Sequence, residues 1–221
     1  MDRADQYWAE VFHVERAELR RPGVHFTYVD EPRAGIYVLQ LDETVRVRAP
    51  MRRRADVDGI RIETALDGAV WRAALADSDP VVLGPAAHYL AGEDIPSSRE
   101  ARVPSIDEVR RMTERIPPEE VEESGVLDPD VDRFGLWAAG TLAALSSLSP
   151  WVGGRTDVGL LVAPGFRGRG LGRRVAAMAL NAATRRSGIA RWRCREENAA
   201  SVAIALGFGL QPYARNLGIR L

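Results

Sequence analysis

A glycine-rich run stands in the last third of the chain, between a short apolar segment and a helical pattern. It reads Val-Ala-Pro-Gly-Phe-Arg-Gly-Arg-Gly-Leu-Gly over residues 162–172. Gly168, Gly170 and Gly172 let backbone N–H groups turn toward one point and let an anion approach without contact from a Cβ atom. A helix that begins directly after them adds its N-terminal dipole, which favours negative charge. The run therefore predicts a phosphate-binding loop.

The segments on both sides of this loop have the patterns that such a cradle needs. A short, partly β-branched apolar run precedes it and predicts a buried strand over residues 156–162. After the loop, apolar residues recur at helical spacing, namely Leu171, Val175, Met178, Ala179 and Ala182. The N–H donors are thus expected at the junction of a strand and a helix.

Three kinds of phosphate loop share this appearance, and the spacing separates them. A dinucleotide fingerprint needs a third glycine where Arg173 stands, and a P-loop needs a lysine, which this chain lacks. What remains is R-x-x-G-x-G, formed by Arg167, Gly170 and Gly172. It closely resembles the pyrophosphate-binding motif of the GNAT superfamily of acyl-CoA N-acyltransferases. The alternative is a chance glycine turn before a helix.

A second motif follows downstream. Residues 189–195 read as a strand, and Asn198 then opens a short segment that ends in Leu206-Gly207-Phe208. This resembles the second GNAT signature, in which an asparagine begins a helix that ends in Leu-Gly-Phe. Asn198 is a good N-cap, and Gly207 is expected in the left-handed position after the helix. The resemblance covers roughly residues 98–221.

The order of the other elements agrees with the resemblance. Ser105 and Glu108 form a capping-box pattern, and a second helix is expected over 118–124, ending at Gly125. Strands are expected near 101–104 and over 134–138, 141–149 and 156–162, with a tight turn at Ala139-Gly140. The segment 210–221 alternates well enough for one or two closing strands. The resemblance implies a mixed α+β GNAT fold, a central mixed, twisted sheet flanked by helices.

Residues 1–97 resemble no family. Tyr7, Trp8, Val11 and Phe12 predict one face of a first helix, residues 35–48 alternate as strands do, and a later helix is expected within 66–75. Residues 91–98 have linker composition. We therefore expect two domains, a small α+β subdomain over 1–97 and a GNAT-like acetyltransferase domain over 98–221. A degenerate copy of the same fold is the alternative interpretation of the first half.

The resemblance implies acetyl-CoA as the co-substrate. Its binding residues are then expected in the loop, in the strand before it and at the second motif, namely Leu161, Val162, Arg167, Gly168, Arg169, Gly170, Leu171, Gly172, Arg173 and Asn198. Arg169, Arg173 and Arg174 flank the loop, and one of them is expected to contact a coenzyme A phosphate, because a guanidinium recognises phosphate through paired donors. Simple exposure to solvent is the alternative.

The resemblance also implies direct attack of an amine on the thioester within a ternary complex. Many relatives carry a tyrosine that protonates the departing thiolate, but Ala203 stands at that position. Some relatives carry a glutamate on the strand before the loop that acts as the general base. This chain has Thr156 at that position. Asp157, one place along, is therefore the first candidate for the general base, and Glu196 is the second.

Composition limits the remaining classes. The net charge of −1 argues against a nucleic-acid binder held by bulk electrostatics. The histidines lack ligand spacing, so no metal site is expected, and no run is long enough to cross a membrane. The single Cys194 is typical of a reducing cytoplasm. We therefore expect a cytoplasmic N-acetyltransferase that acts on an amine of a small molecule or peptide. Its assembly is left open, with a homodimer as one alternative, and a catalytically silent acyl-CoA sensor is the alternative function.

Overall fold

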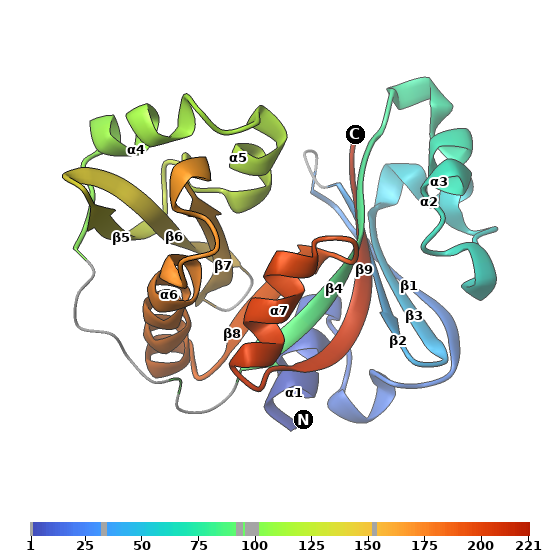
Figure 1. The fold of residues 1–221 in the computed structure, drawn as a ribbon. Coiled ribbons are helices and arrows are strands. Elements are labelled where there is room, and N and C mark those ends of the chain that lie inside the picture. The colour runs from blue at the N-terminus through green and yellow to red at the C-terminus, as the bar shows by residue number, and fades with distance from the viewer. Residues whose placement is uncertain (1, 32–34, 92–94, 96–101, 152–153) are drawn as a thin grey trace. The chain divides into compact units, whose positions relative to one another are not determined.

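The chain folds into two compact units (Figure 1). The structure, a computed structural model, describes residues 2–31, 35–91, 95, 102–151 and 154–221. Unit 1 comprises residues 1–89, 193–202 and 212–221, and unit 2 comprises residues 90–192 and 203–211. These units do not coincide with the ranges 1–97 and 98–221 expected from the sequence, which stay a prediction. Most of the expected linker, residues 92–94 and 96–98, lies outside the described residues.

Unit 1 is built on five strands in the order β1-β3-β2-β9-β4. β1 and β3 run parallel, whereas β2 is antiparallel to both β3 and β9. The strands are β1 (Gly23–Val29), β2 (Ile36–Leu41), β3 (Thr44–Pro50), β4 (Val81–Ala91) and β9 (Gln211–Arg220), and the helices are α1 (Asp2–Phe12), α2 (Arg54–Val57) and α3 (Gly68–Ala74). The predicted first helix, the strands within 35–48 and the helix within 66–75 are confirmed.

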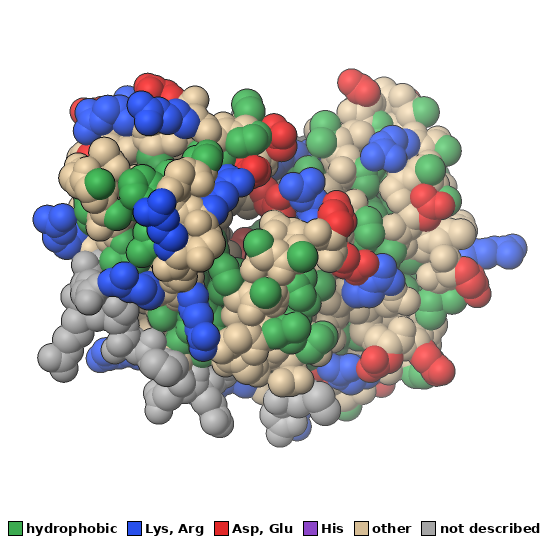
Figure 2. Space-filling view, in the orientation of Figure 1, with side chains coloured by type: hydrophobic (Ala, Val, Ile, Leu, Met, Phe, Trp, Pro, Cys, Tyr) green, Lys and Arg blue, Asp and Glu red, His purple; other side chains and the backbone are tan. Residues whose placement is uncertain are grey.

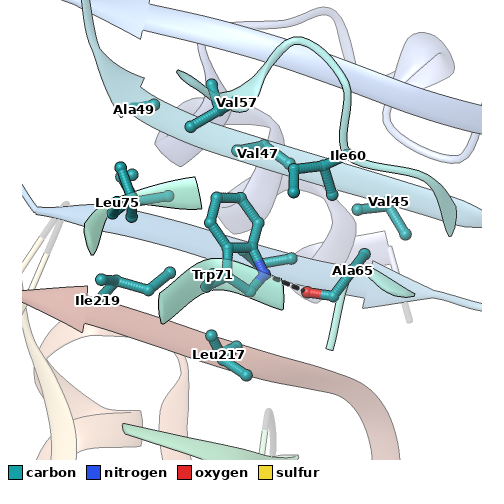
Figure 3. Close-up of a cluster of buried hydrophobic side chains, with 12 residues drawn as sticks. Val45, Val47, Ala49, Val57, Ile60, Ala65, Trp71, Leu75, Leu217 and Ile219 are labelled. Atoms are coloured by element: carbon teal, nitrogen blue, oxygen red, sulfur yellow. Dashed lines mark hydrogen bonds between the residues drawn. The ribbon is translucent and has the colours of Figure 1, made fainter. Parts of the chain in front are cut away.

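Trp71 occupies the centre of a buried apolar cluster in unit 1 (Figure 3). Its indole Nε1 donates a hydrogen bond of 2.8 Å to the carbonyl oxygen of Ala65, so the ring is buried without an unsatisfied donor. Val45 and Val47 of β3 belong to this cluster. Arg46 between them is only 4% exposed, because its guanidinium donates to the carbonyl oxygens of Leu19 and Glu18.

Unit 2 carries the glycine loop. Its strands follow the order β8-β7-β6-β5, in which β5, β6 and β7 are antiparallel neighbours and β7 and β8 are parallel. Its elements are α4 (Ile106–Thr113), α5 (Pro118–Ser124), β5 (Asp132–Ala138), β6 (Thr141–Trp151), β7 (Gly154–Val162) and α6 (Leu171–Ser187), with β8 (Ala190–Arg195) and α7 (Ala199–Gly207) crossing the unit boundary. The predicted mixed α+β architecture is confirmed.

Helices cover both faces of this sheet because successive strand residues point in opposite directions. Leu161 of β7 packs with Val109, Met112 and Ile116 under α4 and α5. Its neighbour Val162 packs on the other face, in the cluster around Val175 of α6. Figure 1 shows α4 and α5 on one side of β5, β6 and β7, with α6 on the other.

Local signals place the ends of these elements. The Ser105 hydroxyl accepts from the backbone N–H of Glu108, whose carboxylate accepts from the N–H of Ser105, so the predicted capping box is confirmed. The second helix ends at Gly125, with a φ of 59°. The predicted tight turn at Ala139-Gly140 has both residues at positive φ, 49° and 73°. Such a turn matches the twist of a two-stranded hairpin.

Two expectations need correction. Gly207 does not adopt the left-handed conformation; Gly209 does, at φ 74°. The N–H groups of Gly209 and Leu210 reach back to the carbonyl oxygens of Leu206 and Ala205, so the left-handed residue after α7 comes two positions later than expected. The strand expected near 101–104 is only a single bridge between Arg102 and Gly135 in the described residues, and residue 101 lies outside them.

Candidate functional site

The glycine loop joins β7 to α6, as its sequence predicts. After a 3-10 turn at Pro164–Phe166, Gly168 and Gly170 both adopt the left-handed conformation, at φ 72° and 73°. Apart from the directly adjoining residues, no atom of the described part of the chain lies within 4 Å of the position that a Cβ atom would take at either glycine. The next three N–H groups, those of Leu171, Gly172 and Arg173, have no acceptor within their own helix. The loop therefore combines open space with donors at a helix N-terminus.

Gly172, unlike Gly168 and Gly170, has close neighbours and serves packing. It lies in the first turn of α6 and is buried. A Cβ atom there would come within 3.1 Å of the Val162 side chain and 3.4 Å of the Ile204 side chain. Its missing side chain therefore lets α6 approach β7 closely, which keeps the helix N-terminus at the strand end.

Arg167, the arginine of the first motif, stabilises the loop through two hydrogen bonds. Its Nε donates to the carbonyl oxygen of Val162 at 3.1 Å, and its Nη2 lies 2.8 Å from Oε2 of Glu120 on α5. One side chain thus links the last residue of β7, the loop and a helix on the opposite face of the sheet.

The two arginines that flank the loop differ in their contacts. Arg169 is exposed, and its guanidinium carbon lies 5.5 Å from the centre of the Phe166 ring. Arg173 donates through Nη2 to the carbonyl oxygen of Gly207 at 2.6 Å and lies 5.2 Å from the centre of the Phe208 ring. Arg173 therefore joins the glycine loop to the Leu-Gly-Phe end of the second motif.

One edge of β7 is without a strand partner near the loop. The ladder to β6 continues to Val162, whereas the described ladder to β8 pairs only Asp157 with Arg191 and Val158 with Trp192. In the described part of the chain, the edge of β7 at residues 159–162 therefore has backbone N–H and C=O groups that make no ladder hydrogen bonds to β8. This places the backbone of Leu161 and Val162 beside the loop, as their assignment to the site requires.

Asp157, the first candidate base, forms a bidentate ion pair with Arg191. Nε of Arg191 lies 2.9 Å from Oδ1, and Nη2 lies 3.2 Å from Oδ2. Arg191 is 1% exposed and its guanidinium carbon lies 4.1 Å from the centre of the Trp151 ring, while the Asp157 side chain is 24% exposed. The carboxylate therefore neutralises a buried cation, and both its oxygens already accept hydrogen bonds.

Glu196, the second candidate, has the same kind of partner. Its two carboxylate oxygens accept from Nε and Nη2 of Arg215 at 2.5 and 2.9 Å. These hydrogen bonds raise the pKa of the Arg215 guanidinium above its ordinary value. Asn198, two residues on, caps α7: its Oδ1 accepts from the N–H of Ser201 at 3.1 Å. The predicted N-cap is confirmed, and its assignment to coenzyme binding stays a prediction.

Sequence reasoning missed a pocket beside the loop. It encloses about 250 Å³, and its lining combines α4, the β5–β6 turn and the start of the loop. The signal was present in the helical spacing of Glu108, Arg111 and Arg115, which puts all three on one face. That spacing does not indicate, however, that α4 and the loop lie next to each other in the fold.

The described residues contain neither a metal-binding cluster nor a helix that could span a membrane. No group of three or more His, Cys, Asp or Glu side chains in these ranges is arranged to hold a metal ion. Among the helices that the structure describes, none has the length and apolarity needed to cross a bilayer.

Comparison with known families identifies one match. Residues 102–208 match the sequence profile described as the Acetyltransferase (GNAT) family. The matched range begins before α4 and ends at Phe208, so it contains the glycine loop and the second motif. Comparison with curated protein sequences finds no match.

Solved structures at low sequence identity have a similar fold over part of the chain. A GNAT-family putative acetyltransferase from Novosphingobium aromaticivorans is 18% identical, with a TM-score of 0.51 over 63% of this chain and 66% of that chain. A Drosophila protein is 20% identical, with a TM-score of 0.51 over 69% of this chain and 56% of that chain. A GNAT acetyltransferase from Colwellia psychrerythraea is 16% identical, with a TM-score of 0.47 over 68% and 61%. The chain spans less than two thirds of each of these proteins.

Proposed function

We propose that this protein is an N-acetyltransferase that transfers the acetyl group of acetyl-CoA to a primary amine. Its residues 102–208 match the GNAT acetyltransferase family profile. The observation that carries the proposal is the loop between β7 and α6. Gly168 and Gly170 are left-handed with open space above them, and the first N–H groups of α6 follow directly. This is the arrangement that binds a pyrophosphate.

The residues present fit coenzyme A. The N–H groups of Leu171, Gly172 and Arg173 would hold the pyrophosphate, with Gly168 and Gly170 leaving room for it. The unpaired edge of β7 at Leu161 and Val162 would offer backbone hydrogen bonds to the amide groups of the pantetheine arm. Arg169 would add positive charge, Arg167 and Arg173 would keep the loop in place, and Asn198 would fix the start of α7.

When bound, acetyl-CoA supplies an acyl thioester that a neutral amine can attack. Asp157 and Glu196 are the carboxylates we propose as proton acceptors for that amine, directly or through water. Each accepts two hydrogen bonds from one arginine, one on each oxygen, and keeps further lone pairs that can take a proton. An acceptor amine of low pKa makes a dedicated base less necessary. Ala203 offers no proton to the thiolate, so that proton comes from water.

The acceptor in this proposal is an amine of a small molecule or a peptide, and the reaction takes place in the cytoplasm. The sequence has a single cysteine, Cys194, which is buried, and a chain with one cysteine forms no intrachain disulfide, in keeping with a reducing compartment.

The proposal is tested by measuring coenzyme binding and turnover separately. Saturating CoA or acetyl-CoA is expected to raise the melting temperature, since a ligand at 100 times its dissociation constant stabilises a protein by about 2.7 kcal/mol. Free-thiol release from acetyl-CoA is then followed against a panel of amines that includes polyamines, amino acids, antibiotics and peptide N-termini.

The two measurements separate the alternatives. Amine-dependent thiol release supports the transferase. CoA binding without release for any amine class would favour a silent acyl-CoA sensor instead. An unchanged melting temperature at millimolar CoA, with native circular dichroism, would contradict both functions.

A further inference from the structure

The pocket beside the glycine loop lies on the face of the sheet that α4 and α5 cover. Met112, Leu142 and Ala163 line its apolar floor, and they pack in the same cluster as Leu161 of β7. Val162, the next residue of β7, packs on the opposite face, under α6. The N–H groups proposed to bind a pyrophosphate belong to the start of α6. The pocket is therefore a separate site, and all of its lining residues belong to unit 2.

Two of the three charged side chains at the rim balance each other. The rim is lined by Glu108, Arg111 and Arg115. Glu108 accepts hydrogen bonds from the N–H and the hydroxyl of Ser105, both at 2.8 Å, and from Nε1 of Trp137 at 3.0 Å. These bonds, together with the positive charge of Arg111, hold the pKa of Glu108 below its ordinary value. Glu108 is thus ionised at neutral pH and offsets the charge of Arg111.

Arg115 carries the remaining charge of the rim. It is exposed in the turn after α4, and it makes no hydrogen bond, ion pair or cation–π contact with another residue in the described part of the chain. Figure 2 shows basic side chains gathered over α4. With two arginines against one glutamate, the rim has a net charge of +1. A guanidinium binds a carboxylate through two parallel N–H donors, so Arg115 can hold an acid group at the rim.

The floor determines what the acid group is attached to. Phe166 adds an aromatic ring to the side chains of Met112 and Leu142. A thioether and an aromatic ring both make favourable contacts with a second ring. The pocket encloses about 250 Å³, more than a carboxylate alone would fill. A strongly polar body would lose its hydration against this floor without gaining hydrogen bonds, so an apolar body fits best.

We propose that this pocket binds a small organic acid with a compact apolar body, with the carboxylate on Arg115 and the body against Met112, Leu142 and Phe166. The acid is either a free ligand or the carboxyl end of the acceptor amine. In the second case the acceptor is an apolar amino acid, and that assignment rests on the proposed function. Because Phe166 also belongs to the 3-10 turn that leads into the glycine loop, the acid is held directly beside that loop.

The test compares hydrocinnamate with hydrocinnamide, which has the same apolar body but no charge. Both are titrated into the full-length protein without coenzyme, by isothermal titration calorimetry. Wild type is expected to bind hydrocinnamate about fivefold or more tightly than hydrocinnamide, since an exposed charge-assisted pair contributes on that order. Arg115→Gln should lower the affinity for hydrocinnamate to that for hydrocinnamide, and it should leave hydrocinnamide binding unchanged.

Three further variants separate the charge from the floor. Arg110→Gln is the matched control, because Arg110 is an exposed arginine of α4 that does not line the pocket, and it should change neither affinity. Glu108→Gln keeps a side chain that can cap α4 but removes the negative charge, so it should strengthen hydrocinnamate binding about twofold or more. Phe166→Leu should weaken both probes alike, because both carry a ring. Circular dichroism and melting temperature check that each variant is folded.

Phenylalanine, which adds an amine to hydrocinnamate, separates the two sources of the acid. If phenylalanine promotes thiol release from acetyl-CoA, with a KM that Arg115→Gln raises while kcat is kept, the carboxylate belongs to the acceptor. If phenylalanine binds with the same dependence on Arg115 but releases no thiol, the pocket takes a free acid.

Three results would overturn the inference. They are equal wild-type affinity for the acid and the amide, a preference for the acid that survives in Arg115→Gln, and no binding of any of the three probes to folded wild type at millimolar concentration. None of these results involves coenzyme. The proposed function is judged separately, by the melting temperature with CoA, so a failure of one is distinguishable from a failure of the other.

Discussion

Arg173 and Gly207 join the two motifs of the sequence. Nη2 of Arg173, in the first turn of α6, donates to the carbonyl oxygen of Gly207, the last residue of α7, at 2.6 Å. A Cβ atom at Gly207 would lie 3.7 Å from the guanidinium carbon, in ordinary contact with it. Arg173, which follows the glycine loop, therefore holds the end of α7 in place.

Replacing Arg173 with methionine is expected to loosen this connection. The bond is exposed, so we expect a loss of about 0.5–1 kcal/mol in the free energy of unfolding. Chemical denaturation measures it. Arg169→Met is the control, because Arg169 contacts the Phe166 ring and leaves α7 untouched. Equal stability of the two variants would contradict a structural role for the Arg173 bond.

Gly170→Ala is expected to weaken coenzyme binding while the fold is kept. Gly170 has a φ of 73°, and an alanine there costs about 1–2 kcal/mol or shifts the backbone. Because the N–H groups of the cradle follow it directly, we expect CoA affinity to fall about tenfold or more. Gly165→Ala, where open space surrounds the Cβ position and φ is not positive, should leave affinity unchanged. A fall of the same size in both variants would place the cradle elsewhere.

Asp157→Asn is expected to destabilise unit 2. It removes the negative charge that faces Arg191, which is 1% exposed, and leaves that cation at most a neutral hydrogen-bond acceptor at this position. Breaking a buried pair costs about 3–5 kcal/mol, and the partly exposed Asp157 should cost about 2–3 kcal/mol. Adding Arg191→Met should recover part of this loss, since the buried cation is then gone. An Asp157→Asn protein as stable as wild type would contradict the prediction.

The same double variant tests Asp157 as a base. If Asp157 only neutralises Arg191, the double variant should keep wild-type turnover once an acceptor is known. If Asp157 takes the proton, both variants should lose turnover about 10²-fold or more, at unchanged CoA affinity. Glu196→Gln measured in parallel assigns or removes the second candidate.

The pair of Asp5 and Tyr213 predicts a pH window for the stability of unit 1. Burial by itself raises the pKa of Asp5, but hydrogen bonds from Arg20 and Tyr213 outweigh it and lower the pKa below 3.8. Its stabilising contribution is therefore complete above pH 4 and is lost as the pH falls through the lowered value. Burial and the hydrogen bond to Asp5 raise the pKa of Tyr213 above 10.0, so its contribution is lost as the pH rises past 10.

Chemical denaturation between pH 2.5 and 11 follows this window, at pH steps of about 0.5. Tyr213→Phe is expected to reduce the fall in the free energy of unfolding at alkaline pH, and Asp5→Asn the fall at acid pH. If these variants lose stability with pH as wild type does, the pH dependence belongs to other groups. The 2.6 Å bond from the Tyr213 hydroxyl to Oδ1 of Asp5 connects residues 208 positions apart, so each variant should also lower stability at neutral pH.

Features with a local cause could be predicted from the sequence. The capping box at Ser105, the turn at Ala139-Gly140 and the cap at Asn198 each depend on residues within three positions of one another. Gly207 shows the limit of such reasoning. Two glycines stand within reach of the helix end, and hydrogen bonds to Ala205 and Leu206 decide that Gly209 takes the left-handed conformation.

Features that depend on distant partners could not be predicted. Asp157 meets Arg191 across 34 positions, so the sequence presented a free carboxylate where the fold has an ion pair. The burial of Arg46 depends on carbonyl oxygens of residues 18 and 19, which no strand pattern indicates. The pocket depends on α4 meeting the loop, an arrangement that exists only in three dimensions.

Strand β9 sets the order in which the chain can finish folding during translation. It is the last strand of the sequence, yet in unit 1 it lies between β2 and β4. Residues 1–89 leave the ribosome long before it, with the facing edges of β2 and β4 unpaired, and such edges attract other chains. Unit 2 needs nothing beyond residue 211. Although domains usually fold from the N-terminus onward as they emerge, the N-terminal unit here is completed last, once residue 220 has been synthesised.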